Sequence, residues 1–130
     1  MSLPQILIVD TDPAAALVTQ HGLQRLLDTK AEVSVVPSPT TAWLRCLREH
    51  IDLVIIDPSP MNSAAVALIK ALHVDRPHTA VMVLTAYDTP RLRSEMRAQG
   101  VEHYLAKPVD LNEIGRQVGL VLDQVGQPIS

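Results

Sequence analysis

Aromatic and cysteine residues are almost missing from this sequence. Its 130 residues include no phenylalanine, one tryptophan, two tyrosines and one cysteine. A single cysteine cannot form a disulfide within the chain, and Pro4 interrupts the N-terminus before any apolar stretch of signal-peptide length, so we expect a cytoplasmic protein. The scarcity of aromatic rings also argues against a stacking surface for single-stranded nucleic acid.

Long apolar runs and a strong charge of one sign are missing too. The longest apolar runs, such as residues 53–56, are far shorter than a membrane span, so we expect no membrane-spanning segment. Lysine and arginine number 11 against 14 aspartate and glutamate residues, and the net charge is −3. Duplex DNA binding needs a basic face, and the lysines are only Lys30, Lys70 and Lys107, so direct binding to nucleic acid is not expected.

The sequence does contain a regular series of short apolar segments. Four of them are apolar on consecutive residues, which is typical of strands covered on both faces: 6–9, 53–56, 80–84 and 104–106. Segment 32–36 alternates more, as expected for a strand at the edge of a sheet. Five strands therefore alternate with five segments of helical length. This order predicts an α/β fold in which a parallel sheet carries helices on both faces.

Several of the helical segments carry the signals of a helix start or end. Asp12 before Pro13 and Thr89 before Pro90 each place a side-chain acceptor at the N-cap and a proline at the first helical position. Gly100 has the position of a left-handed cap after the fourth helix. These signals indicate that the segments are helices with defined ends.

The apolar residues within the helical segments predict which helix faces are buried. The first helix covers about residues 13–27, and the stripe of segment 41–50 is centred on Leu44 and Leu47. The last helix begins with the spacing of a capping box, from Asp110 to Glu113. Two further stripes consist of Ala65, Leu68, Ile69 and Leu72, and of Leu111, Ile114, Val118, Val121, Leu122 and Val125.

The length predicts a single domain. A chain of this size buries roughly two-thirds of its unfolded surface, which is enough for a core without a disulfide or a structural metal. We expect that domain to cover residues 1–125, and residues 126–130 to form a linker-like tail.

Polar residues follow the predicted strands at the points where the strands end. Strand 6–9 is followed by Asp10-Thr11-Asp12, strand 53–56 by Asp57, and strand 80–84 by Thr85, while Lys107 follows the last strand. Because ligands of an open parallel sheet bind beyond the carboxyl ends of its strands, we expect these side chains to share one site.

The residue types at that edge suit phosphoryl chemistry. Two carboxylates can hold Mg²⁺, while Lys107 and Thr85 can bind the oxygens of a phosphoryl group. Asp57 would then be the nucleophile, since the neighbouring positive charge would neutralise its target. The glycine-rich phosphate loops and the catalytic motifs G-x-S-x-G and H-E-x-x-H do not occur.

From Ile6 to about Val125 the chain resembles the receiver domains of bacterial two-component response regulators. The resemblance is carried by four segments in the family's order: 6–10 (ILIVD), 52–57 (DLVIID), 83–86 (VLTA) and 100–108 (GVEHYLAKP). The last of these is the most specific. The resemblance implies a flavodoxin-like sheet with the strand order 2-1-3-4-5.

The resemblance also implies a phosphoacceptor that is not an enzyme and at most assists its own phosphorylation and dephosphorylation. Asp57 would accept a phosphoryl group from a histidine kinase or a histidine phosphotransfer protein. Asp10, Asp57 and the backbone carbonyl of Ser59 would bind Mg²⁺, and Lys107 would pair with the phosphoryl oxygens. The peptide bond between Lys107 and Pro108 is cis in the family, which would turn the lysine toward the site.

The switch residues implied by the resemblance are Thr85, its small neighbour Ala86, and Tyr104. They would respond to the new charge and remodel the surface formed by the fourth helix, the fifth strand and the fifth helix. That surface would act on an output domain C-terminal to residue 130 or on a separate partner, or would form a homodimer.

The chain departs from the family pattern next to Asp10. The family has two adjacent acids there, and the second position is Thr11. Asp12 is displaced by one residue, which turns its side chain away, so we interpret it as an N-cap and only a possible modulator of the site. With one charged ligand fewer, Mg²⁺ binding is expected to be weak.

The loop after Asp57 also departs from the family pattern. Its proline comes one residue early, the usual glycine is missing, and Pro58 removes a backbone N–H beside the acceptor. Ser59 and Tyr87 are possible modulators of the lifetime of the phosphoryl group. The departures leave a second hypothesis open, a pseudo-receiver that binds partners with weak or no Mg²⁺-dependent phosphorylation. A flavodoxin-like enzyme or cofactor carrier is a weaker third hypothesis.

Overall fold

The computed structural model describes residues 3–58 and 63–124. Strands and helices alternate along this part of the chain in the following order: β1 (Gln5–Val9), α1 (Pro13–Leu27), β2 (Glu32–Val36), α2 (Pro39–Arg48), β3 (Leu53–Ile56), α3 (Ser63–Asp75), β4 (Ala80–Thr85), α4 (Pro90–Ala98), β5 (His103–Ala106) and α5 (Leu111–Gln124). The proposed tail 126–130 lies outside the described residues.

The strands form one parallel sheet of five strands in the order β2-β1-β3-β4-β5. The predicted fold class and strand order are therefore confirmed. Strand β3 lies in the middle of the sheet and all four of its residues are buried, which explains its unbroken run of branched apolar residues. Strands β2 and β5 form the two edges.

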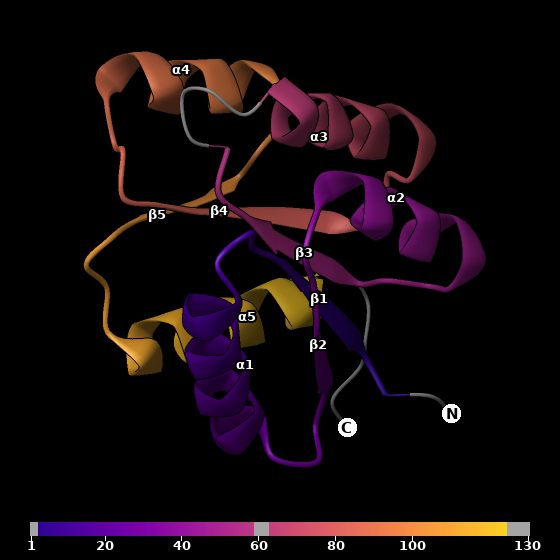
Figure 1. The fold of residues 1–130 in the computed structure, drawn as a ribbon, viewed down its shortest axis with the longest axis vertical. Coiled ribbons are helices and arrows are strands. Elements are labelled where there is room, and N and C mark those ends of the chain that lie inside the picture. The colour runs from indigo at the N-terminus through magenta and orange to yellow at the C-terminus, as the bar shows by residue number, and fades with distance from the viewer. Residues whose placement is uncertain (1–2, 59–62, 125–130) are drawn as a thin grey trace.

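Helices cover both faces of the sheet (Figure 1), with α1 and α5 on one face and α2, α3 and α4 on the other. Each face has its own apolar cluster. One cluster joins Leu23 of α1 and Val118 of α5 to strand residues such as Ile8, whereas the other joins Leu72 of α3 and Met96 of α4 to the opposite side of the strands. This packing holds the strand ends, and the loops that follow them, on a rigid base.

The signals at the helix ends are mostly confirmed. Asp12 and Thr89 are N-caps, each followed by a proline, and Gly100 has the left-handed φ of 85° after α4. The predicted capping box at α5 is wrong. Asp110 Oδ1 accepts a hydrogen bond from the backbone N–H of Asn112, and the carboxylate of Glu113 binds side chains further along α5.

The predicted stripe of α2 is also wrong. Leu44 and Leu47 are 46% and 47% exposed, and the buried residues are Pro39, Ala42 and Cys46. The helix begins two residues earlier than expected because Ser38 caps it, its Oγ accepting from the backbone N–H of Thr41 at 3.1 Å. The small residues Ala42 and Cys46 face the sheet. The stripe predicted for α3 is buried as expected, and so is that of α5 except at Leu111, which is half-buried. Val125 lies outside the described residues.

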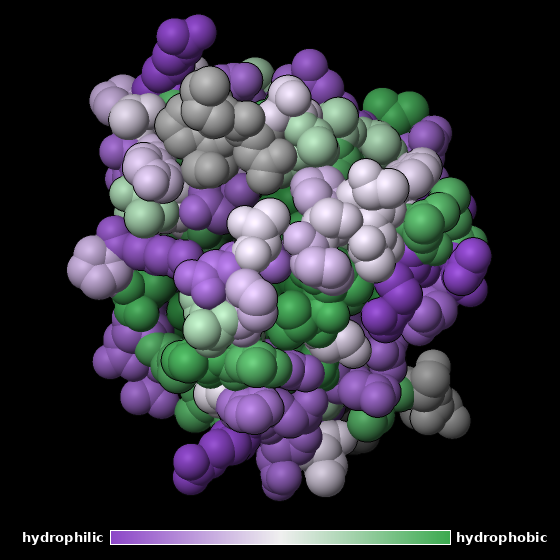
Figure 2. All heavy atoms as spheres, viewed as in Figure 1, coloured by the Kyte–Doolittle hydropathy of each residue, from purple (hydrophilic) through white to green (hydrophobic). Residues whose placement is uncertain are grey.

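The face of the molecule seen in Figure 2 is mostly hydrophilic over α4, and hydrophobic areas lie between polar ones near the start of α1. On α1, Leu17 and Val18 are 50% and 67% exposed. Within residues 3–58 and 63–124, no helix has both the length and the apolar character needed to cross a membrane.

Candidate functional site

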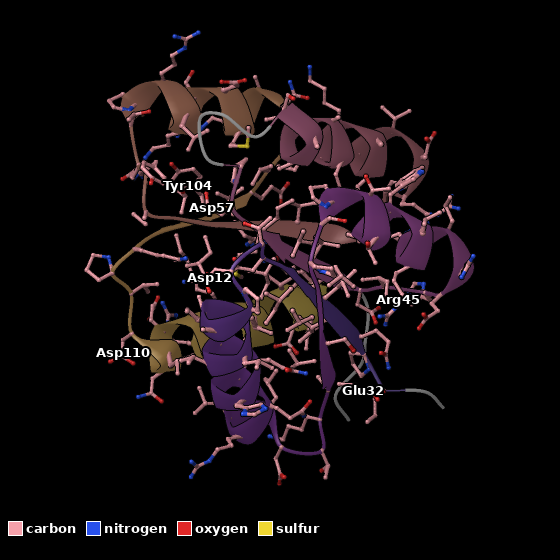
Figure 3. All side chains as sticks on the ribbon, viewed as in Figure 1. Asp12, Glu32, Arg45, Asp57, Tyr104 and Asp110 are labelled. Atoms are coloured by element: carbon pink, nitrogen blue, oxygen red, sulfur yellow. The ribbon has the colours of Figure 1, made fainter. Side chains whose placement is uncertain are left out.

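The four predicted strand ends lie together at the carboxyl edge of the sheet. Val9 of β1 pairs with Ile56 of β3, so Asp10 and Asp57 follow two neighbouring residues. Thr85 ends β4 and pairs with Ala106, the residue before Lys107. Figure 3 shows the labelled Asp12, Asp57 and Tyr104 around this end of the sheet, and Glu32 at the other end.

Asp57 carries an unusual carboxylate oxygen. Its Oδ1 is buried and has no hydrogen-bond partner in the described part of the chain. Buried polar atoms in native proteins nearly always have a partner, because an unpaired one costs about 1–3 kcal/mol. An unpaired carboxylate oxygen of this kind fits a ligand for a hard cation such as Mg²⁺.

Asp10 forms hydrogen bonds with the backbone around it through its N–H and one of its carboxylate oxygens. Its N–H donates to the carbonyl of Val36 at 3.2 Å, and its Oδ1 accepts from the N–H of Asp12 at 2.9 Å. Its Oδ2 makes no hydrogen bond within residues 3–58 and 63–124. One oxygen of Asp10 and one of Asp57 are therefore available for a cation at this edge.

Asp12 serves the helix rather than the site. Its Oδ1 accepts from the N–H groups of Ala14 at 3.1 Å and Ala15 at 3.3 Å, which confirms the predicted N-cap. Thr11 between the two acids is exposed. Within the described ranges, no group of three or more histidine, cysteine, aspartate or glutamate residues could hold a metal ion. At this edge, Asp10 and Asp57 each keep one carboxylate oxygen without a hydrogen bond within residues 3–58 and 63–124.

Thr85 is fully buried at the end of β4. Its Oγ1 accepts from the backbone N–H of Tyr87 at 3.0 Å, which folds the start of the β4–α4 connection back onto the strand end. The residues after it, Ala86 and Tyr87, are exposed. A rotation of the Thr85 side chain away from Tyr87 would break this hydrogen bond and release the backbone at Tyr87.

Lys107 is placed by the backbone of its neighbours. Its N–H donates to the carbonyl of Thr85 at 2.7 Å, and the Lys107–Pro108 peptide bond is cis, as the resemblance implies. The side chain is exposed, and its ammonium group forms no ion pair with a carboxylate among the described residues. Its contact with a phosphoryl group stays a prediction.

Tyr104 belongs to a cluster that the sequence analysis missed. Its hydroxyl donates to Oδ1 of Asp88 at 2.9 Å, and the guanidinium of Arg93 donates to Oδ2 of the same carboxylate at 2.6 Å. The guanidinium carbon of Arg93 lies 4.9 Å from the centre of the Tyr104 ring. Burial, the hydrogen bond to Asp88 and the nearby negative charges of Asp88 and Asp57 raise the pKa of Tyr104 to about 12. A sequence signal existed only in part: Asp88 precedes a predicted helix that has an arginine in its first turn.

The third metal ligand implied by the resemblance, the carbonyl of Ser59, lies outside the described residues.

A cavity of about 570 Å³ lies at the opposite edge of the sheet, where β4 and β5 begin, and is lined among others by His73, Thr79 and His103. It is therefore separate from the strand ends that carry Asp10, Asp57 and Thr85.

The sequence of this chain is similar to a known family and to several characterised proteins. Residues 6–118 match the model of the response regulator receiver domain. Among characterised relatives, the DNA-binding transcriptional regulator NtrC of Bradyrhizobium is 29% identical over 130 residues, and the two-component response regulator PhoP of Pseudomonas aeruginosa is 26% identical over 118 residues. The chain spans 26% of the length of that NtrC and 51% of that PhoP.

Solved structures share the fold at low sequence identity. The CheY-like receiver domain protein of Methanospirillum hungatei is 23% identical and has a TM-score of 0.85, with 95% of this chain and 97% of that one covered. The receiver domain of an HD domain-containing protein of Pseudomonas fluorescens is 23% identical, with a TM-score of 0.83 over 98% of this chain and 100% of that one. With 113 consecutive positions matched and the strand order β2-β1-β3-β4-β5, this chain belongs to the response regulator receiver domains of two-component signalling.

Proposed function

We propose that this receiver domain accepts a phosphoryl group on Asp57 from a phosphohistidine of a kinase or a phosphotransfer protein. The observation that supports it best is the buried Oδ1 of Asp57, which has no partner among the described residues and lies where four strands deliver polar groups. In the reaction, a carboxylate oxygen of Asp57 forms a bond to phosphorus while the phosphorus–nitrogen bond to the histidine ring breaks, and the ring nitrogen keeps the electron pair.

Mg²⁺ is the cofactor that these residues fit. Asp57, the Oδ2 side of Asp10 and the backbone carbonyl of Ser59 would hold it, because carboxylate and carbonyl oxygens are the ligands that this ion prefers. When bound, the ion would neutralise part of the negative charge of the phosphoryl group. Thr11 adds no charged ligand, so the affinity is proposed to be weak.

Three further residues would respond to the phosphoryl group. Lys107 would pair with its oxygens, and Thr85 would give up the N–H of Tyr87 to face it, with room left by the small side chain of Ala86. Tyr104 would follow Thr85, since their strands are neighbours in the sheet. The changed α4-β5-α5 surface would then act on an output domain beyond residue 130, on another partner, or on a second copy of the chain.

The protein that donates the phosphoryl group must approach the edge that carries Asp10 and Asp57. Helix α1 begins three residues after Asp10 and carries the exposed residues Leu17 and Val18, an apolar surface of the kind that partner proteins cover. Val18→Asp should slow transfer from a phosphohistidine protein and leave phosphorylation by acetyl phosphate unchanged. An equal loss with both donors would show that Val18 acts on the site and not on docking.

A pseudo-receiver remains the second candidate because of one observation. Thr11 stands where the family has its second acid, and the nearest acid after it is Asp12. Oδ1 of Asp12 already accepts hydrogen bonds from the N-terminus of α1. A Mg²⁺ titration separates the two proposals. Saturable binding that is lost in Asp10→Asn and in Asp57→Asn supports the phosphoacceptor, whereas the absence of saturable binding to the wild type supports the pseudo-receiver.

Beryllofluoride with Mg²⁺ provides the direct test of the acceptor, because it mimics a phosphoryl group on a carboxylate. We expect it to raise the thermal unfolding temperature of the wild type and to leave Asp57→Asn unchanged. Asp123→Asn is the matched control, since it removes the same charge from an exposed position on α5. An identical response of wild type and Asp57→Asn would refute the proposal.

A further inference from the structure

The connection between β4 and α4 is held at three successive points. At its start, the N–H of Tyr87 donates to Oγ1 of Thr85, and at its end the N–H of Leu92 donates to Oγ1 of Thr89, both at 3.0 Å. Between them, Asp88 reaches across to Tyr104 on β5. Of these three contacts, the one between Asp88 and Tyr104 reaches another strand. Asp88 therefore ties the β4–α4 connection to the edge strand β5.

The contacts of Asp88 form a closed triangle with Arg93 and Tyr104. One carboxylate oxygen accepts from the phenol at 2.9 Å and the other from the guanidinium at 2.6 Å, while the guanidinium lies over the phenol ring, 4.9 Å from its centre. Arg93 is in the first turn of α4, so the triangle joins the loop, the helix and β5. The hydrogen bond from Arg93 lowers the pKa of Asp88, which keeps the carboxylate charged at neutral pH.

The strength of this triangle is moderate. The side chains of Asp88 and Arg93 are 30% and 50% exposed, so water weakens the attraction between their charges. The guanidinium of Arg93 over the ring of Tyr104 adds a further attraction, which is also weak at an exposed site. Contacts of this size shift a conformational equilibrium several-fold without locking it.

The triangle opposes the movement that the proposed function requires. If the Thr85 hydroxyl turns to a phosphoryl group on Asp57, it releases the N–H of Tyr87, and the backbone next to Asp88 has to move. If Tyr104 follows Thr85, its hydroxyl has to leave the carboxylate of Asp88. The first movement therefore shifts the backbone next to Asp88, and the second breaks the hydrogen bond between Tyr104 and Asp88.

We infer that Asp88 is a positioning residue that, through Tyr104 and Arg93, holds the β4–α4 connection in the unphosphorylated arrangement and so sets how readily the domain switches. The inference rests on the proposed function, since it concerns the response to a phosphoryl group on Asp57. It assigns to Asp88 a role that acts through Tyr104 and not through contact with the reacting atoms.

The test measures the apparent affinity for beryllofluoride at a fixed Mg²⁺ concentration. Removing the charge in Asp88→Asn should tighten binding roughly three- to tenfold, because less energy is then needed to reach the switched arrangement. Tyr104→Phe removes the same hydrogen bond from the other side, so in that background Asp88→Asn should give a smaller gain. Glu113→Gln is the matched control, since it breaks an exposed arginine–carboxylate pair on α5 and should not change the affinity.

A spectroscopic signature separates this role from a general loss of stability. In a Tyr87→Phe background, 3-fluorotyrosine labels Tyr104 alone, because the sequence has two tyrosines. The fluorine signal should move toward its beryllofluoride-bound position in Asp88→Asn and stay in place in Glu113→Gln.

The outcomes are distinct. If beryllofluoride binds the wild type but Asp88→Asn binds it no tighter, or leaves the fluorine signal unmoved, the inference is overturned and the proposed function stands. If the wild type itself binds no beryllofluoride, the proposed function fails and the inference fails with it.

Discussion

Replacing Asp57 by asparagine should stabilise the domain when Mg²⁺ is absent. The buried Oδ1 of Asp57 has no hydrogen-bond partner within the described residues, and such an atom costs about 1–3 kcal/mol, more when it is charged. An amide of the same shape carries no charge, so we expect Asp57→Asn to gain about 1 kcal/mol. For a domain of this size, that gain corresponds to a rise of roughly 3–5 °C in the unfolding temperature.

Mg²⁺ should reverse the order of the two proteins. At a concentration about ten times its dissociation constant, a ligand that binds only the folded state adds about 1.4 kcal/mol of stability. The wild type should therefore overtake Asp57→Asn, which has lost a ligand oxygen. Thermal unfolding with EDTA and across a Mg²⁺ series measures both effects. An Asp57→Asn variant that is no more stable than Asp123→Asn in EDTA would contradict this prediction, as would equal stabilisation of all three proteins by Mg²⁺.

Three further predictions concern the rim of the site. Thr11→Asp restores a second acid beside Asp10, so it should tighten Mg²⁺ binding at least about tenfold in a calorimetric titration and lower the stability of the Mg²⁺-free protein, an effect that salt reduces; unchanged Mg²⁺ affinity would contradict it. Asp12→Ala should cost about 1 kcal/mol in urea unfolding by removing the cap of α1, with Mg²⁺ affinity unchanged; loss of binding would make Asp12 a ligand. The pKa of Tyr104 is raised from 10.0 to about 12, so the folded state holds this proton longer than the unfolded state, and the stability due to Tyr104 is complete below pH 10 and falls between pH 10 and pH 12. Tyr104→Phe should flatten that part of the stability–pH curve, and an unchanged curve would count against the shifted pKa.

Local sequence signals predicted most of the fold because buried strands and helix caps each leave a recognisable pattern in a few consecutive residues. The continuous apolar runs of β1, β3 and β4 follow from burial on both faces of a sheet, and Asp12 before Pro13 marks a helix start through short-range hydrogen bonds. In α2 the prediction was wrong, because Ala42 and Cys46 are buried whereas Leu44 and Leu47 are exposed. Large apolar residues were expected to face the core, but small ones let the helix approach the sheet.

The site was predictable only as far as it depends on strand ends. Parallel strands bring Asp10, Asp57 and Thr85 to one edge whatever the details of packing. The contact between Asp88 and Tyr104 joins residues 16 positions apart across two different elements, and no spacing rule for helices or strands covers it. The same holds for the Asp57 oxygen that has no partner among the described residues, since that absence depends on the positions of all its neighbours there.

Incubation with acetyl phosphate and Mg²⁺, followed by mass spectrometry, measures directly whether Asp57 accepts a phosphoryl group. We expect the wild type to gain one phosphoryl group, peptide mapping to place it on Asp57, and EDTA or Asp57→Asn to abolish it. A wild type that gains no phosphoryl group, or an Asp57→Asn variant that gains it as readily, would contradict the account.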